Sequence, residues 1–242
     1  DQTNLRNTHF YDTITNVADR SAPYEFRNPN ERLQFNATMS YYVDNFAGGT
    51  HDFKFGVQIG NDTMKQSRII IGDTRLIAIG GVADEAQLIN TPFASDQRMS
   101  DYGFFVQDAW TIGQRATLNI GLRFDGLRGR VPPQTSPAGT WIGARNEAEI
   151  NDIPNWGPNV APRIGLSYDL TGDGKTALKV YYGRFYIQTG TSIPQNMNPV
   201  FESSVNVPWN DLNGDLFLEP GPSGTFADSP ELDLTRLREQ GF

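Results

Sequence analysis

Hydrophobic and polar residues alternate along six segments of the chain, and these segments come in three pairs. In the first segment every odd position from Leu33 to Val43 is apolar, and the even positions between them are mostly polar. A period of two residues is typical of a β-strand that has one apolar and one polar face. The paired segments are 32–43 with 52–59, 101–110 with 117–125, and 162–170 with 178–182.

Short connections join the two segments of each pair, whereas the long stretches 60–100 and 126–159 separate the pairs. The tight connections predict three β-hairpins within 32–187. Outer-membrane barrels have short periplasmic turns and long extracellular loops, and this chain shows the same asymmetry. The sequence therefore predicts an all-β fold, an antiparallel transmembrane β-barrel segment of about six strands in which 60–100 and 126–159 are extracellular loops.

The two ends of the chain lack a comparable alternation, so 1–31 and 188–242 are predicted to be extracellular loops as well. The second end holds eight acidic and two basic residues and supplies −6 of the net charge of −8. The simpler interpretation is an acidic loop exposed to solvent. The more specific alternative is a loop that binds cationic ligands or divalent ions. Ser229 and Pro230, followed by leucines and then Gly241, predict a short helix over 230–240.

The two faces of the predicted strands require different surroundings, one apolar and one aqueous. The apolar face matches the height of a bilayer, and the opposite face carries polar side chains that need water. Asp108 interrupts the apolar face beside Trp110, where we expect it at the membrane rim. The predicted lumen-facing residues are Lys54, Gln58, Asn119, Arg123, Arg163 and Lys179, and the predicted aromatic residues at the lipid interfaces are Tyr41, Trp110, Phe124, Tyr168 and Tyr182.

A soluble or surface-exposed β-sandwich is the alternative that the same alternation allows. Its apolar faces would meet in a dry core, and its loop tryptophans and acids would hold a glycan or calcium. In that fold Phe35, Val57, Leu122 and Leu166 would contact one another. In a membrane barrel they would face lipid.

Composition narrows the possible functions further. The 24 Gly and 15 Pro favour a turn-rich β-protein, and the absence of Cys excludes disulfides and thiol-based metal or catalytic sites. The net charge of −8 is the wrong sign for binding nucleic acid. No run of 18 apolar residues exists, so a membrane-spanning helix is not predicted. We predict no cofactor, no metal site and no enzymatic activity, because no catalytic constellation stands out.

Two short motifs imitate known binding loops without completing them. Gly174-Lys175-Thr176 resembles the end of a phosphate-binding loop, but Asp169 stands where the first glycine of that motif belongs. Asp211, Asn213 and Asp215 offer three oxygen-bearing side chains at alternate positions, fewer than calcium needs. We predict turns at both places. The loop tryptophans Trp141, Trp156 and Trp209 are expected to pack rather than to bind sugar.

Three stretches of the chain carry distinctive strand and turn sequences. The residues at 102–125 read YGFFVQDAWTIGQRATLNIGLRFD, and those at 161–186 read APRIGLSYDLTGDGKTALKVYYGRFY. The third and weaker stretch is His51-Asp-Phe-Lys-Phe-Gly-Val57. Taken together, the three stretches strongly resemble the barrel of TonB-dependent outer-membrane receptors, and in particular their Oar-like, carboxypeptidase-regulatory-like branch.

The resemblance implies a location in the cell outer membrane and a 22-stranded barrel around an N-terminal plug. Such a receptor binds a scarce extracellular ligand, a small molecule, peptide or oligosaccharide, and imports it with energy relayed by TonB. The implied partners are outer-membrane lipid and TonB, the latter through a plug that this chain does not show. Six strands are too few to close a barrel, so the chain is expected to be a piece of one.

Overall fold

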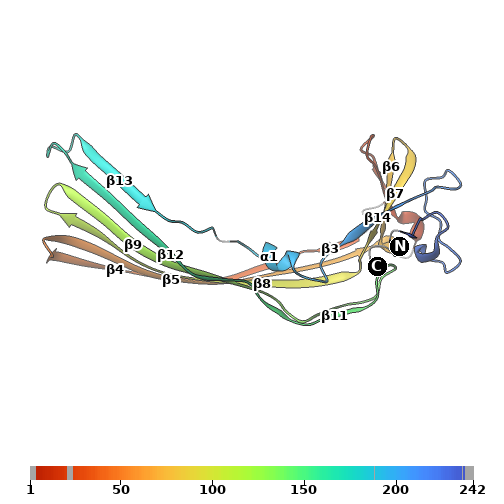
Figure 1. Cartoon of the computed structure of the whole chain (residues 1–242), viewed down its shortest axis with the longest axis horizontal. Helices are drawn as coiled ribbons and strands as arrows, with labels where there is room; N and C mark the ends of the chain where they lie inside the picture. Colours follow the sequence, from red (N-terminus) through yellow and green to blue (C-terminus); the bar gives the residue numbers. More distant parts are fainter. Residues whose placement is uncertain (1–3, 21–23, 188, 236, 238–242) are drawn as a thin grey trace.

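The computed structural model describes residues 4–20, 24–187, 189–235 and 237. Long antiparallel strands form one seven-stranded sheet that extends through most of the molecule (Figure 1). Its order is β13-β12-β9-β8-β5-β3, with β4 also paired to β5. The antiparallel all-β fold predicted from the alternation is confirmed. The strands are β3 (Tyr24–Arg27), β4 (Asn30–Phe46), β5 (Gly49–Ile70), β8 (Phe93–Ile112), β9 (Ala116–Val131), β12 (Ile150–Asp169) and β13 (Ala177–Gly183).

Three hairpins, β4–β5, β8–β9 and β12–β13, close through short turns at one end of this sheet (Figure 1). Glycine allows the backbone conformation that such turns require, and Gly48 and Gly113 have φ of 83° and 57°. In the third turn the Asp169 carboxylate accepts hydrogen bonds from the N–H groups of Gly172 and Gly174, both at 2.9 Å. Local turn chemistry therefore sets the register of each pair.

Four of the strands are longer than the sequence predicts, which corrects the expected loops 60–100 and 126–159. β5 continues to Ile70, β8 begins at Phe93, β9 continues to Val131, and β12 begins at Ile150. Beyond about position 60 the residues of β5 are polar on both faces, as in Asn61-Asp62-Thr63. The hydrophobic period disappears there although the hydrogen-bond ladder between the strands continues, so periodicity alone places the strand ends too early.

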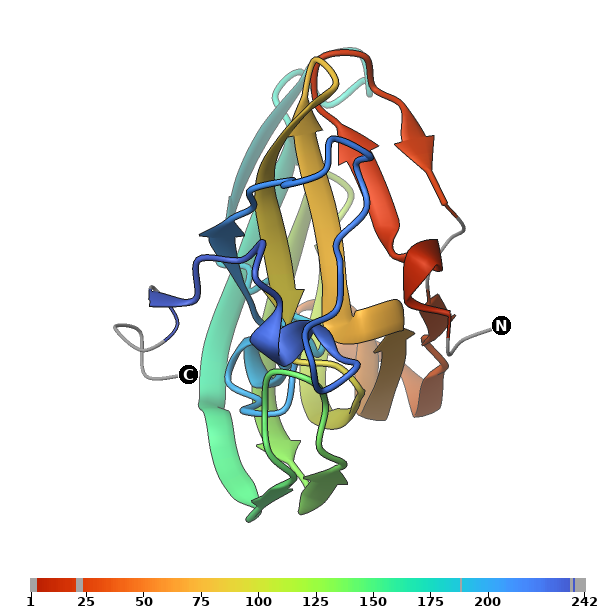
Figure 2. The same ribbon diagram turned by 90° about the vertical axis from the view of Figure 1, so that its right-hand side faces the viewer.

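At the other end of the sheet the chain folds into a second body, which we call the head and define as residues 4–20, 71–92 and 201–235 with 237. It lies at the right of Figure 1 and faces the viewer in Figure 2. Its sheet has the order β14-β7-β6-β1-β2, in which β1 and β6 are parallel. The elements are η1 (Leu5–Asn7), β1 (His9–Asp12), β2 (Ala18–Asp19), η2 (Ile71–Asp73), β6 (Thr74–Ile79), β7 (Val82–Ile89), β14 (Ser204–Pro208) and η3 (Phe226–Asp228).

The head contains a hydrophobic core, so 1–31 and 188–242 are not the simple loops that the sequence predicted. Trp209 is 2% exposed and Phe226 is 1% exposed, and both pack with Leu76 and Leu88 of the central strands. Glu231 is also buried, and its carboxylate accepts hydrogen bonds from the N–H groups of two loop residues. The strands of the head are short, and two of their pairings, β1 with β6 and β7 with β14, join segments that are far apart in the sequence. Such pairings leave no local period that could reveal them.

A connecting segment crosses one face of the long sheet between β13 and the head. It contains α1 (Ser192–Asn196), which lies on the side towards which the molecule bends in Figure 1. Gln195 Nε2 donates to Gln66 Oε1 at 2.7 Å, and Asn198 Nδ2 donates to Gln97 Oε1 at 3.1 Å. The segment is therefore fixed to β5 and β8. β10 (Gln134–Ser136) pairs with β11 (Arg145–Glu147), and Gln134 Nε2 donates to Asn198 Oδ1 of the connecting segment at 3.2 Å.

The predicted helix over 230–240 is wrong in its first part. Leu232 forms an isolated bridge with Trp209, which places it in an extended conformation. The Asp233 N–H also donates to the Pro208 carbonyl at 3.1 Å. Residues 236 and 238–240 lie outside the described residues. In the part of the chain that the structure describes, no helix is long and apolar enough to cross a membrane.

Asp12 ties two hairpin tips of the head together. Its carboxylate accepts hydrogen bonds from the N–H groups of Thr15 (3.0 Å), Ile14 (2.9 Å), Gly80 (3.1 Å) and Gly81 (2.5 Å). These hydrogen bonds, the one from Thr15 first, lower the pKa of Asp12 from 3.8 to about 2, although burial of the carboxylate acts in the opposite direction. A carboxylate with four N–H donors is favoured in its charged form.

We expect this carboxylate to make the head less stable in acid. Because its pKa is lower in the folded state, its contribution is complete above pH 3.8 and is lost as the pH falls towards 2. The urea midpoint of the full-length protein, followed by tryptophan fluorescence, is expected to be higher than that of Asp12→Asn at pH 5. The difference should narrow between pH 4 and pH 2. A difference that widens in acid would contradict the role of Asp12.

Candidate functional site

The strand register divides the long sheet into two faces, because directly paired residues of neighbouring strands point to the same side. Lys54 pairs with Gln107, Gln107 with Gly121, and Gly121 with Arg163, so this row crosses four strands. We call this side the polar face. The structure places all six predicted lumen-facing residues on it, namely Lys54, Gln58, Asn119, Arg123, Arg163 and Lys179.

Ion pairs and amide hydrogen bonds connect polar side chains of β4, β5, β8 and β9 on the polar face. Arg123 binds Asp125 through Nε at 2.8 Å, and its Nη2 donates to Gln58 Oε1 at 3.3 Å. Gln58 Nε2 donates in turn to Asp101, whose carboxylate lies 3.1 Å from Arg32. The sequence identified Gln58 and Arg123 but missed Arg32 and Asp101. Their positions in the alternation were the available signal, since they share the parity of the polar residues on their strands.

Arg163 differs from Arg32 and Arg123 of the same face, which form ion pairs with carboxylates. Within the described ranges, Lys54, Arg163 and Lys179 form no ion pair. The guanidinium carbon of Arg163 lies 4.8 Å from the centre of the Phe185 ring, a cation–π contact. Its Nε is buried and has no hydrogen-bond partner. An unsatisfied buried donor is costly, so this position is suited to receive an acceptor.

A groove on the polar face surrounds Arg163. The groove consists of three hollows that share Arg163, the largest of the three with a volume of about 250 Å³ and the other two with volumes of about 110 and 170 Å³. The floor of the groove is open at Gly121, where an added Cβ would meet nothing closer than 3.4 Å. By contrast, the Phe105 ring covers Gly56 on the same face. The largest hollow is lined by Arg123, Asp125, Gly126, Leu127, Trp156, Asn159, Ala161, Arg163, Phe185, Tyr186 and Ile187.

The aromatic walls of the groove could not be assigned from the sequence. Trp156 is 47% exposed and lies in β12 after an irregularity in the register, within a stretch predicted to be a loop. Phe185 and Tyr186 follow β13 and continue alongside β12, where the Arg184 N–H donates to the Pro162 carbonyl at 3.0 Å. The expectation that loop tryptophans pack holds for Trp209. Trp141 is also anchored, through Nε1 to the Asp73 carbonyl at 3.0 Å.

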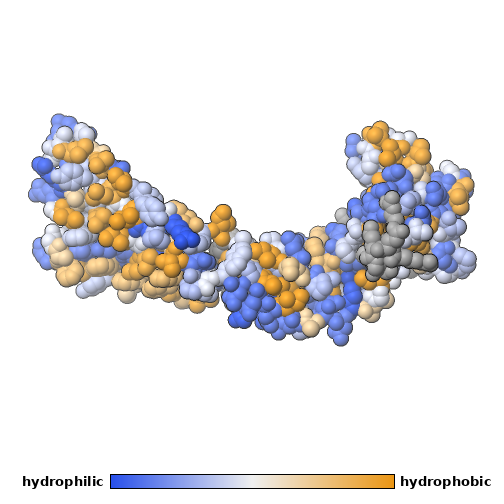
Figure 3. Space-filling model, in the orientation of Figure 1, coloured by the Kyte–Doolittle hydropathy of each residue, from blue (hydrophilic) through white to orange (hydrophobic). Residues whose placement is uncertain are grey.

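The opposite side of the sheet is apolar and uncovered. Phe35 is 60% exposed, Val57 39% and Leu166 38%, so these side chains do not meet in a dry core. The sandwich alternative is therefore wrong for this sheet, because a sandwich would bury that face against a second sheet. Hydrophobic residues gather over the end that holds the short turns (Figure 3). All five predicted interface aromatics lie on this apolar face: Tyr41, Trp110, Phe124, Tyr168 and Tyr182.

Asp108, which interrupts the apolar face, has a partner that the sequence did not suggest. His51 Nδ1 lies 2.6 Å from Asp108 Oδ2, and His51 Nε2 lies 3.1 Å from the Phe46 carbonyl oxygen. The imidazole stacks between the rings of Phe53 and Trp110, with centroids 5.3 and 5.2 Å away. The Asp108 carboxylate is therefore stabilised on the apolar face by its contact with His51 and by the neighbouring aromatic rings. The sequence had suggested only that Asp108 lies at the membrane rim.

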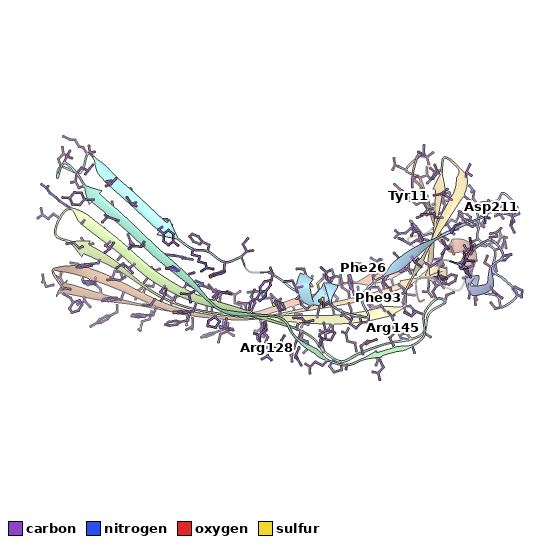
Figure 4. The ribbon with its side chains drawn as sticks, viewed as in Figure 1. Tyr11, Phe26, Phe93, Arg128, Arg145 and Asp211 are labelled. Carbon is purple, nitrogen blue, oxygen red and sulfur yellow. The ribbon has the colours of Figure 1, made fainter. Side chains whose placement is uncertain are left out.

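The acidic loop of the head forms turns, as predicted. Asp211 accepts hydrogen bonds from the N–H groups of Gly214 and Leu216, both at 2.8 Å, and Asn213 accepts from the Asp215 N–H at 3.0 Å. Figure 4 shows Asp211 in the head, far from Arg128 midway along the sheet. Among the described residues, no group of three or more His, Cys, Asp and Glu side chains could hold a metal ion.

Comparisons with known proteins agree with this geometry. Residues 2–235 match the family described as the outer membrane beta barrel domain. The chain is 24% identical over 186 residues to the TonB-dependent transporter Oar of Myxococcus xanthus. That alignment covers 69% of this chain and 16% of the transporter, so the chain spans a small part of that relative. No solved structure matches.

Proposed function

The chain belongs to the outer membrane beta barrel domain family, and from that premise we propose that it forms part of the wall of a TonB-dependent receptor. The protein lies in the cell outer membrane. In the proposed function the complete receptor binds a scarce extracellular ligand and imports it with energy relayed by TonB. The energy relay and the import are inferred from the transporter that the chain resembles.

The uncovered apolar face is the observation that carries this proposal. It continues across neighbouring strands, as in the row Val57, Phe104, Phe124 and Val160, without an intervening polar residue. An exposed apolar surface of this extent would make a soluble protein aggregate, whereas lipid covers it favourably. We therefore assign the apolar face to lipid and the polar face to the barrel lumen.

The change in polarity along the strands supports a definite membrane boundary. On β9 the lipid-side residues run from Leu118 to Phe124, and two strand positions beyond Gly126 the same side carries Arg128. On β8 the same side carries Arg98 opposite Arg130. Because about 9 to 11 residues cross a bilayer, strands as long as β5 and β8 project beyond it. The head then lies outside the cell, at the edge opposite the short turns.

Uptake by cells tests the proposed function. Cells that produce the full-length protein and cells that lack it are given radiolabelled cobalamin, ferric citrate, a casein peptide digest and a dextrin mixture. We expect faster uptake of at least one probe in the producing cells, and we expect the gain to vanish in a strain without TonB. A gain that persists without TonB, or no gain with any probe, would count against the proposal.

A further inference from the structure

We propose that the groove around Arg163 is a binding site for a small solute that carries a carboxylate next to a flat apolar group. The inference rests on the proposed function in one respect, since it takes the polar face to line the lumen. It adds a substrate class and a recognition residue. Arg163 would bind the carboxylate, and the rings of Trp156 and Phe185 would contact the flat group.

The surroundings of the Arg163 guanidinium favour the binding of a planar anion. The guanidinium carbon lies over the Phe185 ring, 4.8 Å from the ring centre. This contact restricts the movement of the guanidinium, and its planar fork of N–H donors matches the two oxygens of a carboxylate. The buried and unpartnered Nε of Arg163 is the donor that such a ligand would satisfy.

The charge of the groove favours an anion. Arg123 and Asp125 form an ion pair of 2.7 Å and offset one another, so Arg163 is the cation of the largest hollow that remains without a counter-charge. The chain as a whole carries a net charge of −8, so acidic residues outnumber basic ones, and yet none of them forms an ion pair with Arg163 in the described part of the chain. A carboxylate at Arg163 would replace water with charge-assisted hydrogen bonds inside a partly enclosed hollow.

The shape of the groove favours a flat ligand over a bare ion. Trp156, Phe185 and Tyr186 line its hollow of about 250 Å³, and Phe185 is 63% exposed. Small-molecule sites are mostly apolar, with a few polar groups that fix orientation. Tyr186 is held in place because its hydroxyl donates to the Val160 carbonyl at 3.3 Å. A phosphate or another compact anion would leave these walls without a contact.

Binding of 4-fluorobenzoate to the purified full-length protein tests the site, with fluorine NMR as the readout and empty micelles as the blank. We expect saturable binding by the wild type, and binding about tenfold weaker to Arg163→Gln, because the charge-assisted pair is lost. Lys179→Gln removes the same charge from the same face outside the groove, and should change the affinity less than twofold. The neutral 4-fluorobenzamide should bind at least tenfold more weakly than the acid.

Further variants keep the test decisive if Arg163→Gln fails to fold, which is checked by heat-modifiable migration on gels. Phe185→Leu lies outside every strand and should weaken 4-fluorobenzoate binding severalfold, while Arg163→Lys should give an intermediate loss. Absence of saturable binding by the wild type, equal binding by Arg163→Gln, or equal binding of the amide would overturn the proposal. Because binding is measured without transport, intact binding with TonB-independent uptake would refute only the proposed function.

Discussion

Replacing Leu122 by Arg is expected to destabilise the folded protein in a bilayer by about 2–4 kcal/mol, because an arginine near the bilayer midplane must give up its hydration. Leu122 lies in the middle of the apolar stretch of β9, opposite Val106 of β8 and Pro162 of β12. The free energy is measured by urea unfolding of the full-length protein in lipid vesicles.

The matched control for that variant is Asn119→Arg on the same strand. Asn119 lies on the polar face, so its side chain would remain in water, and we expect a change below about 1 kcal/mol. The comparison tests the assignment of the two faces rather than the tolerance of β9 for arginine. Equal losses for the two variants, or a larger loss for Asn119→Arg, would show that the assignment of faces is reversed or absent.

Replacing Trp209 by Ala is expected to destabilise the head by about 3–5 kcal/mol, since a fully buried tryptophan leaves a large cavity. Trp209 is 2% exposed and packs among the apolar side chains of β6, β7 and β14. The hairpins of the long sheet do not share this core. We therefore expect limited proteolysis to cleave the variant within 71–92 and 201–235, while heat-modifiable migration of the barrel is retained.

Leu212→Ala is the control within the same segment. Leu212 is 69% exposed, so its truncation should leave protease resistance unchanged. If Trp209→Ala were as resistant as wild type, the head would not depend on this core. Residues 188–242 would then behave as a solvated loop.

The part of the fold that the sequence predicted depends on local regularity. A strand in contact with lipid on one side and water on the other must alternate, and the chain from Leu33 to Val43 shows the alternation without help from any distant residue. The same rule assigned Lys54, Arg163 and Lys179 to one face. The hairpins could be predicted from the short turns rich in Gly and Asp, because the backbone conformation of such a turn is set by a few neighbouring residues.

The sequence failed where both sides of a strand are in water or where partners are distant. The ladder from Asn61 to Ile70 has no apolar face, so nothing in the local pattern distinguishes it from a loop. The core around Trp209 joins β1, β6 and β14, which come from widely separated parts of the chain. Pairings over such distances leave no period in the sequence.

The strand pairs, their two faces and the membrane environment that those faces require follow from the local pattern of residues. The head with its own core, the contact of His51 with Asp108, and the position of Phe185 over Arg163 became visible only when the chain was folded. The difference lies in the range of the interactions. Solvent acts on every residue locally and leaves a period of two, whereas packing between distant segments depends on how the whole chain folds back on itself.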